Sequence, residues 1–359
     1  MEKKSVRNSN VELLRILAAL GVIVLHYNNA EIGGGFRYVE VFSANSYIMY
    51  FLENMFICAV NLFVLITGFF MSEKKKVSIR KPIELVCQVI VFNMGILLLR
   101  TIIGGSILPW KEYLIGILPL NYYVTLYIVV YLLSPYINML LGSLTDGSFK
   151  SLVTMLFILF SLWPTILETV SMIAGGDLGG MNTIGITGSQ SGYTSLNFIL
   201  MYILGVYLKR TITRENPTKY LWKLCLCWII QFAISYIAMV KGFGMGPIWA
   251  YSNPLVILSA IYSFMLFYNM KEIKSKAINE LAKASFTVYL MHSFFLSKIK
   301  IDVFVGMNPI IYVGHVIISC MVIYLICYIL YLIYNLIASH VFKYLNKKIY
   351  FLDVTCEKL

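Results

Sequence analysis

The chain is a succession of long apolar blocks separated by short polar segments. Most blocks hold about 20 residues, enough to cross roughly 30 Å of hydrocarbon as a helix. They are continuously apolar rather than alternating, which excludes a membrane β-barrel. We therefore predict an all-α bundle of about ten membrane-spanning helices, of which the sixth and the ninth are short: Leu13 to Ala30, Tyr47 to Met71, Glu84 to Ile103, Tyr122 to Leu141, Phe149 to Ser171, Ser195 to Leu208, Tyr220 to Val240, Pro247 to Met270, Ala282 to Leu296 and Pro309 to Ala338.

The positions of the basic residues predict how these helices are oriented. Cytoplasmic loops of membrane proteins carry an excess of Lys and Arg. When the connecting segments are assigned to alternate sides, six of the 29 Lys and Arg residues fall on one side and the other 23 on the opposite side. The richer side includes both ends of the chain. Both termini are therefore predicted to be cytoplasmic.

Composition supports a membrane protein and argues against an ordinary soluble protein, a disordered chain and a nucleic-acid-binding protein. Of the 359 residues, 59% are hydrophobic and 13% charged, and the mean hydropathy is +0.79. Soluble domains are about 45 to 50% apolar and about 25% charged, so the chain is neither an ordinary soluble protein nor a disordered one. In a soluble protein a net charge of +12 would suggest a nucleic-acid partner. Here the orientation signal explains the charge, so we expect membrane lipids and no nucleic acid as partners.

The chain is predicted to form one membrane domain over residues 1–359. The first apolar block has no small-residue cleavage site and a second block follows it closely, so we expect it to remain as a span. The seven cysteines show no metal-ligand spacing, and no metal site is predicted. The longest external segment, Thr169 to Thr194, is rich in Gly and lacks Lys and Arg. A loop of this length is usually functional or mobile, and its Gly-rich part, residues 174–192, fits either reading.

Candidate chemistry lies in the first span, because an ionisable residue inside a membrane is costly unless it faces a cavity or a partner. Arg15 and His26 are eleven residues apart, which corresponds to about 1100° of helix rotation, within roughly 20° of three full turns. They therefore share one helix face. Their rise of about 16.5 Å leaves Arg15 near the cytoplasmic surface and His26 well inside the bilayer. Glu12 is three residues before Arg15, close enough to pair with it.

This spacing suits a ligand that is anionic at one end and reactive at the other. A guanidinium can hold phosphate through paired hydrogen bonds. A neutral imidazole deeper in the membrane can take a proton from an attacking hydroxyl. Coenzyme A thioesters have this shape, a phosphorylated nucleotide joined by a long arm to an acyl group. The alternative is that Arg15 is a snorkelling residue of the positive-inside pattern and His26 a hydrogen-bonded interior residue.

Four segments carry a resemblance to a known family. Through these segments and their order along the chain, the sequence resembles the acyltransferase 3 family of integral membrane acyltransferases. Within that family it resembles the bacterial surface-polysaccharide O-acetyltransferases. The most specific segment matches the family's arginine, ten residues, histidine pattern. The four segments are Glu12 to His26, Asn61 to Phe70, Tyr123 to Pro135 and Ala284 to His292.

The resemblance implies transfer of an acyl group from cytoplasmic acyl-CoA, usually acetyl-CoA, to a hydroxyl of a glycan at the outer face of a bacterial cell membrane. The acceptor would be a surface polysaccharide or a lipid-linked glycan. His26 would be the catalytic histidine and Arg15 the donor-side arginine. Arg80 falls where the family often has a basic pair, although the pair is imperfect here. Thr67 replaces the family's usual Ser before Gly68 and keeps a hydroxyl.

Other polar residues of the spans each have a functional and a structural interpretation. Asn61 and Thr67 could place dipoles on the pantetheine arm of coenzyme A, or form interhelical hydrogen bonds. His292 has a predicted depth similar to that of His26, and could orient it, line the acceptor entrance or be a structural histidine. Glu53, in the outer part of the second span, could bind sugar hydroxyls.

A tyrosine stripe and two open choices complete the prediction. Tyr123, Tyr127 and Tyr131 recur every four residues on one helix face, either as interior packing or, for Tyr127 in particular, as lining of a substrate tunnel. His26 could act as general base for direct attack or carry the acyl group covalently. The alternative function class is a transporter or flippase of a lipid-linked saccharide, which would share the spans, the basic inner loops and a polar cavity.

Overall fold

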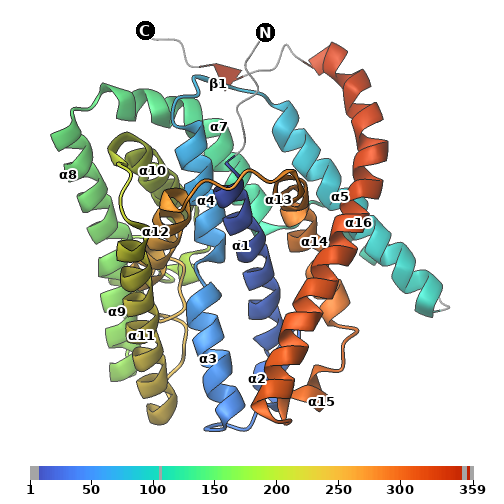
Figure 1. Ribbon diagram of the computed structural model, residues 1–359, viewed down its shortest axis with the longest axis horizontal. Helices are drawn as coiled ribbons and strands as arrows, with labels where there is room; N and C mark the ends of the chain where they lie inside the picture. Colours follow the sequence, from blue (N-terminus) through green and yellow to red (C-terminus); the bar gives the residue numbers. More distant parts are fainter. Residues whose placement is uncertain (1–7, 105–106, 350–353, 356–359) are drawn as a thin grey trace.

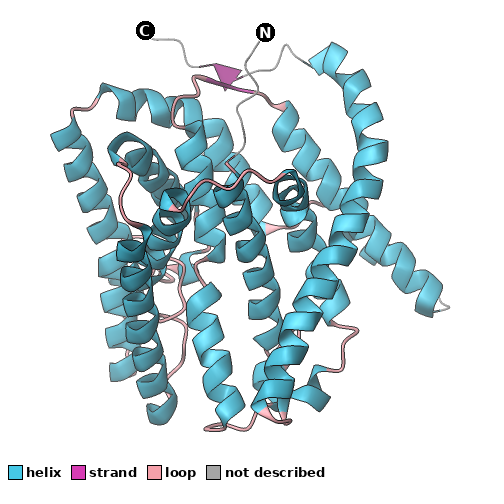
Figure 2. Cartoon of the chain, in the orientation of Figure 1, coloured by secondary structure: helices cyan, strands magenta, loops and turns pink. Residues whose placement is uncertain are grey.

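The protein is a bundle of helices. The computed structural model describes residues 8–104, 107–349 and 354–355, which are mostly helical with very little strand (Figures 1 and 2). The elements are α1 (Ser9–Asn28), α2 (Gly35–Tyr38), α3 (Ala44–Phe56), α4 (Ala59–Met71), β1 (Lys76–Val77), α5 (Arg80–Gly104), α6 (Trp110–Ile117), α7 (Tyr122–Ser143), α8 (Asp146–Phe157), a π-helical turn (Ile158–Leu162), α9 (Trp163–Ala174), 3₁₀ turns at Gly179–Met181 and Gln190–Gly192, α10 (Ser195–Thr211), α11 (Pro217–Lys241), α12 (Pro254–Asn269), α13 (Lys276–Leu281), a 3₁₀ turn (Ala282–Ala284), α14 (Ser285–Leu296), α15 (Ile301–Val305), α16 (Pro309–Ile349) and β2 (Val354–Thr355), which pairs antiparallel with β1.

Helix α1 lies in the middle of the bundle (Figure 1). Leu14, Ala18 and Val22 recur at helical spacing and pack in a core with residues of α4, α10 and α12. Ala19 and Ile23 lie on another face and pack in a second core with residues of α14 and α16. Because α1 is covered on both faces, the polar groups it carries point between helices rather than into lipid.

The start of α1 is fixed by polar side chains. Asn8 caps the helix by accepting the N–H groups of Asn10 and Val11. The Asn10 amide donates to the carbonyl of Met270 at 3.1 Å, and its oxygen accepts the N–H of Ile273 at 2.9 Å. These bonds hold the segment between α12 and α13 against the beginning of α1, so two segments predicted to be cytoplasmic lie together.

Most of the predicted spans correspond to long apolar helices. Among the residues that the structure describes, seven helical segments are long and apolar enough to cross a membrane: Ser9–Asn28, Ala44–Met71, Arg80–Gly104, Trp110–Ser143, Asp146–Ala174, Pro217–Lys241 and Pro309–His340. The sixth, eighth and ninth predicted spans contain helices of 17, 16 and 12 residues, namely α10, α12 and α14. The chain is thus a multi-pass helical membrane protein, whereas the count of ten and the side of the termini stay predictions.

The outer helices present apolar side chains to their surroundings. In the most apolar stretch of α5 only 17% of the residues are buried, against 67% in that of α1. Ile102 and Ile103, near the end of α5, are more than two-thirds exposed, and Figure 1 shows this helix leaving the body of the bundle. An apolar surface of this extent indicates a lipid environment rather than water.

Two glycines allow α4 and α10 to pack closely. A Cβ atom on Gly68 would clash with the carbonyl oxygen of Tyr202, and one on Gly205 would lie 2.7 Å from the backbone nitrogen of Phe69. This contact fixes the direction of α4 and therefore of Thr67, which precedes Gly68.

Gly68→Ala is expected to destabilise the protein by about 1–3 kcal/mol, because the backbones of α4 and α10 must separate to admit the methyl group. The measurement is the midpoint of thermal denaturation in detergent. Gly95→Ala is the matched control, since a Cβ at this position of α5 meets no atom within 4 Å. Equal midpoints for the two variants would contradict the close packing.

Candidate active site

A cavity of about 250 Å³ lies between α1, α4, α5, α7 and α14. Its cationic residues are Arg15 from α1, Lys81 from the start of α5 and Lys283 from the turn before α14. Val22, two turns further along α1 than Arg15, also lines it. The cavity thus extends about 10 Å along α1, from a cationic region into the interior of the bundle.

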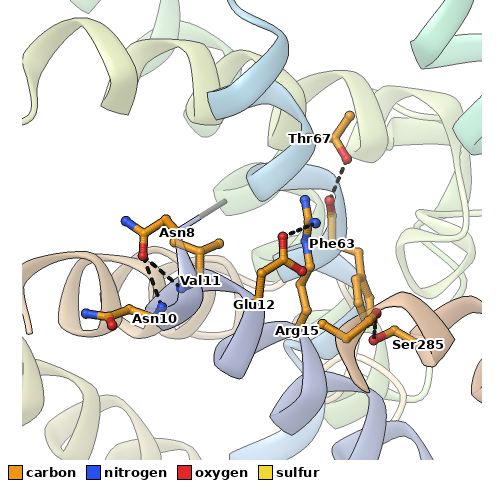
Figure 3. Close-up of polar contacts among 9 residues, drawn as sticks. Asn8, Asn10, Val11, Glu12, Arg15, Phe63, Thr67 and Ser285 are labelled. Atoms are coloured by element: carbon orange, nitrogen blue, oxygen red, sulfur yellow. Dashed lines mark hydrogen bonds and ion pairs between the residues drawn. The ribbon is translucent and has the colours of Figure 1, made fainter. Parts of the chain in front are cut away.

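Arg15 faces this cavity while paired with Glu12. Its Nη1 atom donates to Glu12 Oε1 at 3.0 Å, and the two side chains are 30% and 8% exposed. Figure 3 shows both on α1, close to Thr67 and Phe63 of α4 and to Ser285 of α14. A guanidinium has five N–H donors, more than the bond to Glu12 uses. The pair therefore holds Arg15 in place and leaves donors for an anionic ligand.

The wall beyond Arg15 is largely aromatic. Tyr123 and Tyr127 of α7 line the cavity with their rings stacked, the centroids 6.0 Å apart at an interplanar angle of 24°. Phe63 lies edge-on to Tyr123 at 6.5 Å. Thr67 also lines the cavity and donates its hydroxyl to the carbonyl of Phe63 at 2.8 Å. The structure therefore brings Glu12, Arg15, Thr67 and Tyr127 to one site.

His26 lies one helical turn beyond the cavity's inner end. Its Nδ1 atom is 2.9 Å from the carbonyl oxygen of Val22, the residue that lines that end. A carbonyl oxygen can only accept, so Nδ1 carries the proton and Nε2 keeps its lone pair. The side chain is only partly buried. In this tautomer of the neutral ring, Nε2 is the nitrogen that can accept a proton from a hydroxyl.

His292 of α14 meets His26 across the helix interface. The ring centroids are 4.6 Å apart, with the planes at 61°. His292 is 2% exposed, and its Nδ1 donates to the carbonyl of Val288 at 2.8 Å. Its Nε2 lies 3.2 Å from the Ser293 hydroxyl. Because His292 is buried and hydrogen-bonded, its ring cannot easily move, and its contact with the His26 ring limits the rotation of the His26 side chain.

Two predicted donor-side residues lie outside the cavity lining. Asn61 is fully buried, donates to the carbonyl of Tyr251 at 2.8 Å and accepts from Asn197 at 3.1 Å, so it joins α4 to α10 and to the segment before α12. Arg80 pairs with Glu84 one turn along α5. Lys81, its neighbour in sequence, lines the cavity instead.

Glu53 belongs to a separate polar network at the C-terminal end of α1. Its carboxylate accepts from the Asn28 amide at 3.0 Å, and Asn28 accepts from the Tyr312 hydroxyl at 3.1 Å. Glu53 and Asn28 are almost completely buried. The network joins α1, α3 and α16 and does not line the cavity.

Sequence reasoning missed several residues of the site. Lys81 and Lys283 counted only as orientation charges, although both line the cavity. Tyr289, also in the lining, lies three residues before His292 on α14, with its ring centroid 6.3 Å from that of the histidine. The sequence signal that could have identified Tyr289 is its position within Ala284 to His292, one of the four segments that resemble the family.

The fold and this site define a helical membrane protein with a cation-lined cavity leading toward a pair of histidines. Residues 8–332, nearly the whole chain, match the family described as Acyltransferase domain, the acyltransferase 3 family. The chain belongs to this family, as its sequence motifs indicated, and is a membrane acyltransferase. No curated protein and no solved structure is significantly similar to it.

Proposed function

We propose that this acyltransferase moves an acetyl group from cytoplasmic acetyl-CoA to a hydroxyl of an extracytoplasmic glycan, in the plasma membrane of a bacterium. The observation that carries the proposal is the course of the cavity, from the cations Arg15, Lys81 and Lys283 to Val22, next to His26. A donor with phosphates at one end and a thioester at the other matches that course.

The donor binds with its phosphates at the cationic end. Arg15 forms charge-assisted hydrogen bonds there, and Lys81 and Lys283 add positive charge. The pantetheine arm follows the aromatic wall past Phe63 and Tyr127. The rise of about 16.5 Å between Arg15 and His26 is the distance that the arm must bridge.

The acceptor hydroxyl arrives from the outer side and meets the thioester beside His26. The Nε2 atom of His26 takes the hydroxyl proton while the oxygen attacks the thioester carbonyl. The new carbon–oxygen bond forms and the carbon–sulfur bond breaks. His26 returns the proton to the sulfur, and coenzyme A leaves toward the cytoplasm as the free thiol. His292 acts as a positioning residue through its contact with the His26 ring.

Acetyl-CoA turnover by the purified full chain in detergent tests this function. The acceptor is de-O-acetylated cell-envelope polysaccharide from a strain lacking the gene. We expect free thiol to appear faster when polysaccharide is added, and O-acetyl protons to appear in its NMR spectrum. A transporter would instead move saccharide without acetyl-CoA. Absence of thiol release, together with an unchanged O-acetyl content in the deletion strain, would overturn the proposal.

A further inference from the structure

Four tyrosines from separate parts of the chain lie close together near His292. Tyr122 begins α7, Tyr251 precedes α12 and Tyr289 lies on α14, while Tyr193 is the last residue but one of Thr169 to Thr194, the Gly-rich segment. The ring of Tyr193 is edge-on to those of Tyr122 and Tyr251, with centroids 4.7 and 4.9 Å away. The Tyr289 hydroxyl donates to the side chain of Asn121 at 3.1 Å. We call these four tyrosines and Asn121 the tyrosine cluster.

The cluster extends from the protein surface to the histidine pair. Tyr122 and Tyr193 are 40% and 45% exposed. Tyr289, at the other end, lines the donor cavity and lies 6.3 Å from His292, which contacts His26. The cluster therefore has exposed members, Tyr122 and Tyr193, and one member, Tyr289, that borders the donor cavity.

The Gly-rich segment holds Tyr193 in place through an unusual backbone. Gln190 and Ser191 have φ values of 50° and 53°, between Gly188 at +88° and Gly192 at +80°. Such values are uncommon for residues other than Gly and persist where surrounding contacts enforce them, often at functional sites. The Ser191 carbonyl accepts the N–H of Tyr251 at 2.8 Å. This bond ties the loop directly to another member of the cluster.

Glu168 of α9 fixes the same segment from the other side. One of its carboxylate oxygens accepts the N–H of Ser189 and, at 3.2 Å, the amide of Asn182; the other accepts the Ser189 hydroxyl at 2.9 Å. These hydrogen bonds therefore anchor the segment and fix the position of Tyr193, so the segment does more than connect two helices.

We propose that the tyrosine cluster is the subsite that binds a sugar ring of the acceptor and presents its hydroxyl to His26, an inference that rests on the proposed function. Aromatic rings cover the apolar faces of sugars, while phenol hydroxyls and an amide such as Asn121 bond their hydroxyls. Thr169 to Thr194 contains no Lys or Arg. The cluster thus suits a neutral glycan, whereas the opposite end of the site suits an anion.

Tyr193→Ala is expected to raise the KM for de-O-acetylated envelope polysaccharide about tenfold, because one face of the subsite is lost. The KM for acetyl-CoA is expected to stay at its wild-type value. Tyr193→Phe keeps the ring and is expected to retain most of the affinity. Tyr122→Ala provides a second variant with the same expectation, should Tyr193→Ala fail to reach the membrane.

Tyr236→Ala is the matched control, because Tyr236 is 44% exposed and lies 6.0 Å from the ring of Tyr47, outside the cluster. It should leave both KM values unchanged. Normal donor turnover with an unchanged acceptor KM in Tyr193→Ala and Tyr122→Ala would overturn the subsite alone. Absence of thiol release by the wild-type protein, together with an unchanged O-acetyl content in the deletion strain, would instead overturn the proposed function, and the subsite with it.

Discussion

Replacing His26 with alanine is expected to lower the rate of acetyl transfer about 10²- to 10⁴-fold, the usual contribution of a general base. His26 lies one turn beyond Val22 at the inner end of the donor cavity. The Nε2 atom of the neighbouring His292 lies 3.2 Å from the Ser293 hydroxyl, so we do not expect His292 to replace His26 as the base. The measurement is thiol release from acetyl-CoA in the presence of polysaccharide, together with the O-acetyl content of the cell envelope. The amount of protein in the membrane should not change.

His340→Ala is the control for this variant. His340 makes the same kind of bond, from Nδ1 to the carbonyl of Leu336 at 2.8 Å, but it is exposed near the end of α16 and lies outside the cavity lining. It should retain the wild-type rate. Full activity in the His26→Ala protein would refute the assigned role and leave His26 as an interior structural residue.

Arg15→Ala is expected to raise the KM for acetyl-CoA about ten- to a hundredfold, because hydrogen bonds between charged groups are each worth about 1.5–3 kcal/mol. Arg15→Lys should give an intermediate KM, since an ammonium cannot donate two parallel hydrogen bonds to phosphate. The readout is the initial rate of thiol release over a range of acetyl-CoA concentrations.

Two further variants separate ligand binding from folding. Arg15→Ala leaves the buried carboxylate of Glu12 without its partner, so the double variant with Glu12→Gln should recover membrane expression and keep the high KM. Arg100→Ala removes an ion pair of the same 3.0 Å length, with Glu112, that joins α5 to α6 away from the cavity. A KM increase as large in Arg100→Ala as in Arg15→Ala would contradict a specific donor contact.

The extent of the first span shows what hydropathy can and cannot predict. The apolar pattern placed it at Leu13 to Ala30, whereas α1 spans Ser9–Asn28. The additional turn begins with Ser9 and Asn10, whose polar side chains are bonded to the segment around residues 270–275. Those partners are distant in sequence, so hydropathy could not identify them. The ninth span differs in the opposite direction: its α-helix, α14, begins three residues later than predicted, because the 3₁₀ turn Ala282–Ala284 precedes it.

The candidate site was predictable only where one helix determines the geometry. Arg15 and His26 share a helix, so their common face followed from helical periodicity alone. Arg80 and Lys81 are adjacent but point about 100° apart on α5, and the packing of that helix decides which of them reaches the cavity. The contact between His26 and His292 likewise depends on how α1 packs against α14.

The position of Arg15 and His26 on one uninterrupted helix has a consequence for selectivity. Movements of α5, α7 or α14 can widen or narrow the cavity, but they cannot change the separation between the two side chains along α1. In the proposed reaction, that constant separation selects the carrier by the length of its arm, whereas the surroundings of His26 select the acyl group. The two specificities can therefore change independently, by substitutions on different helices.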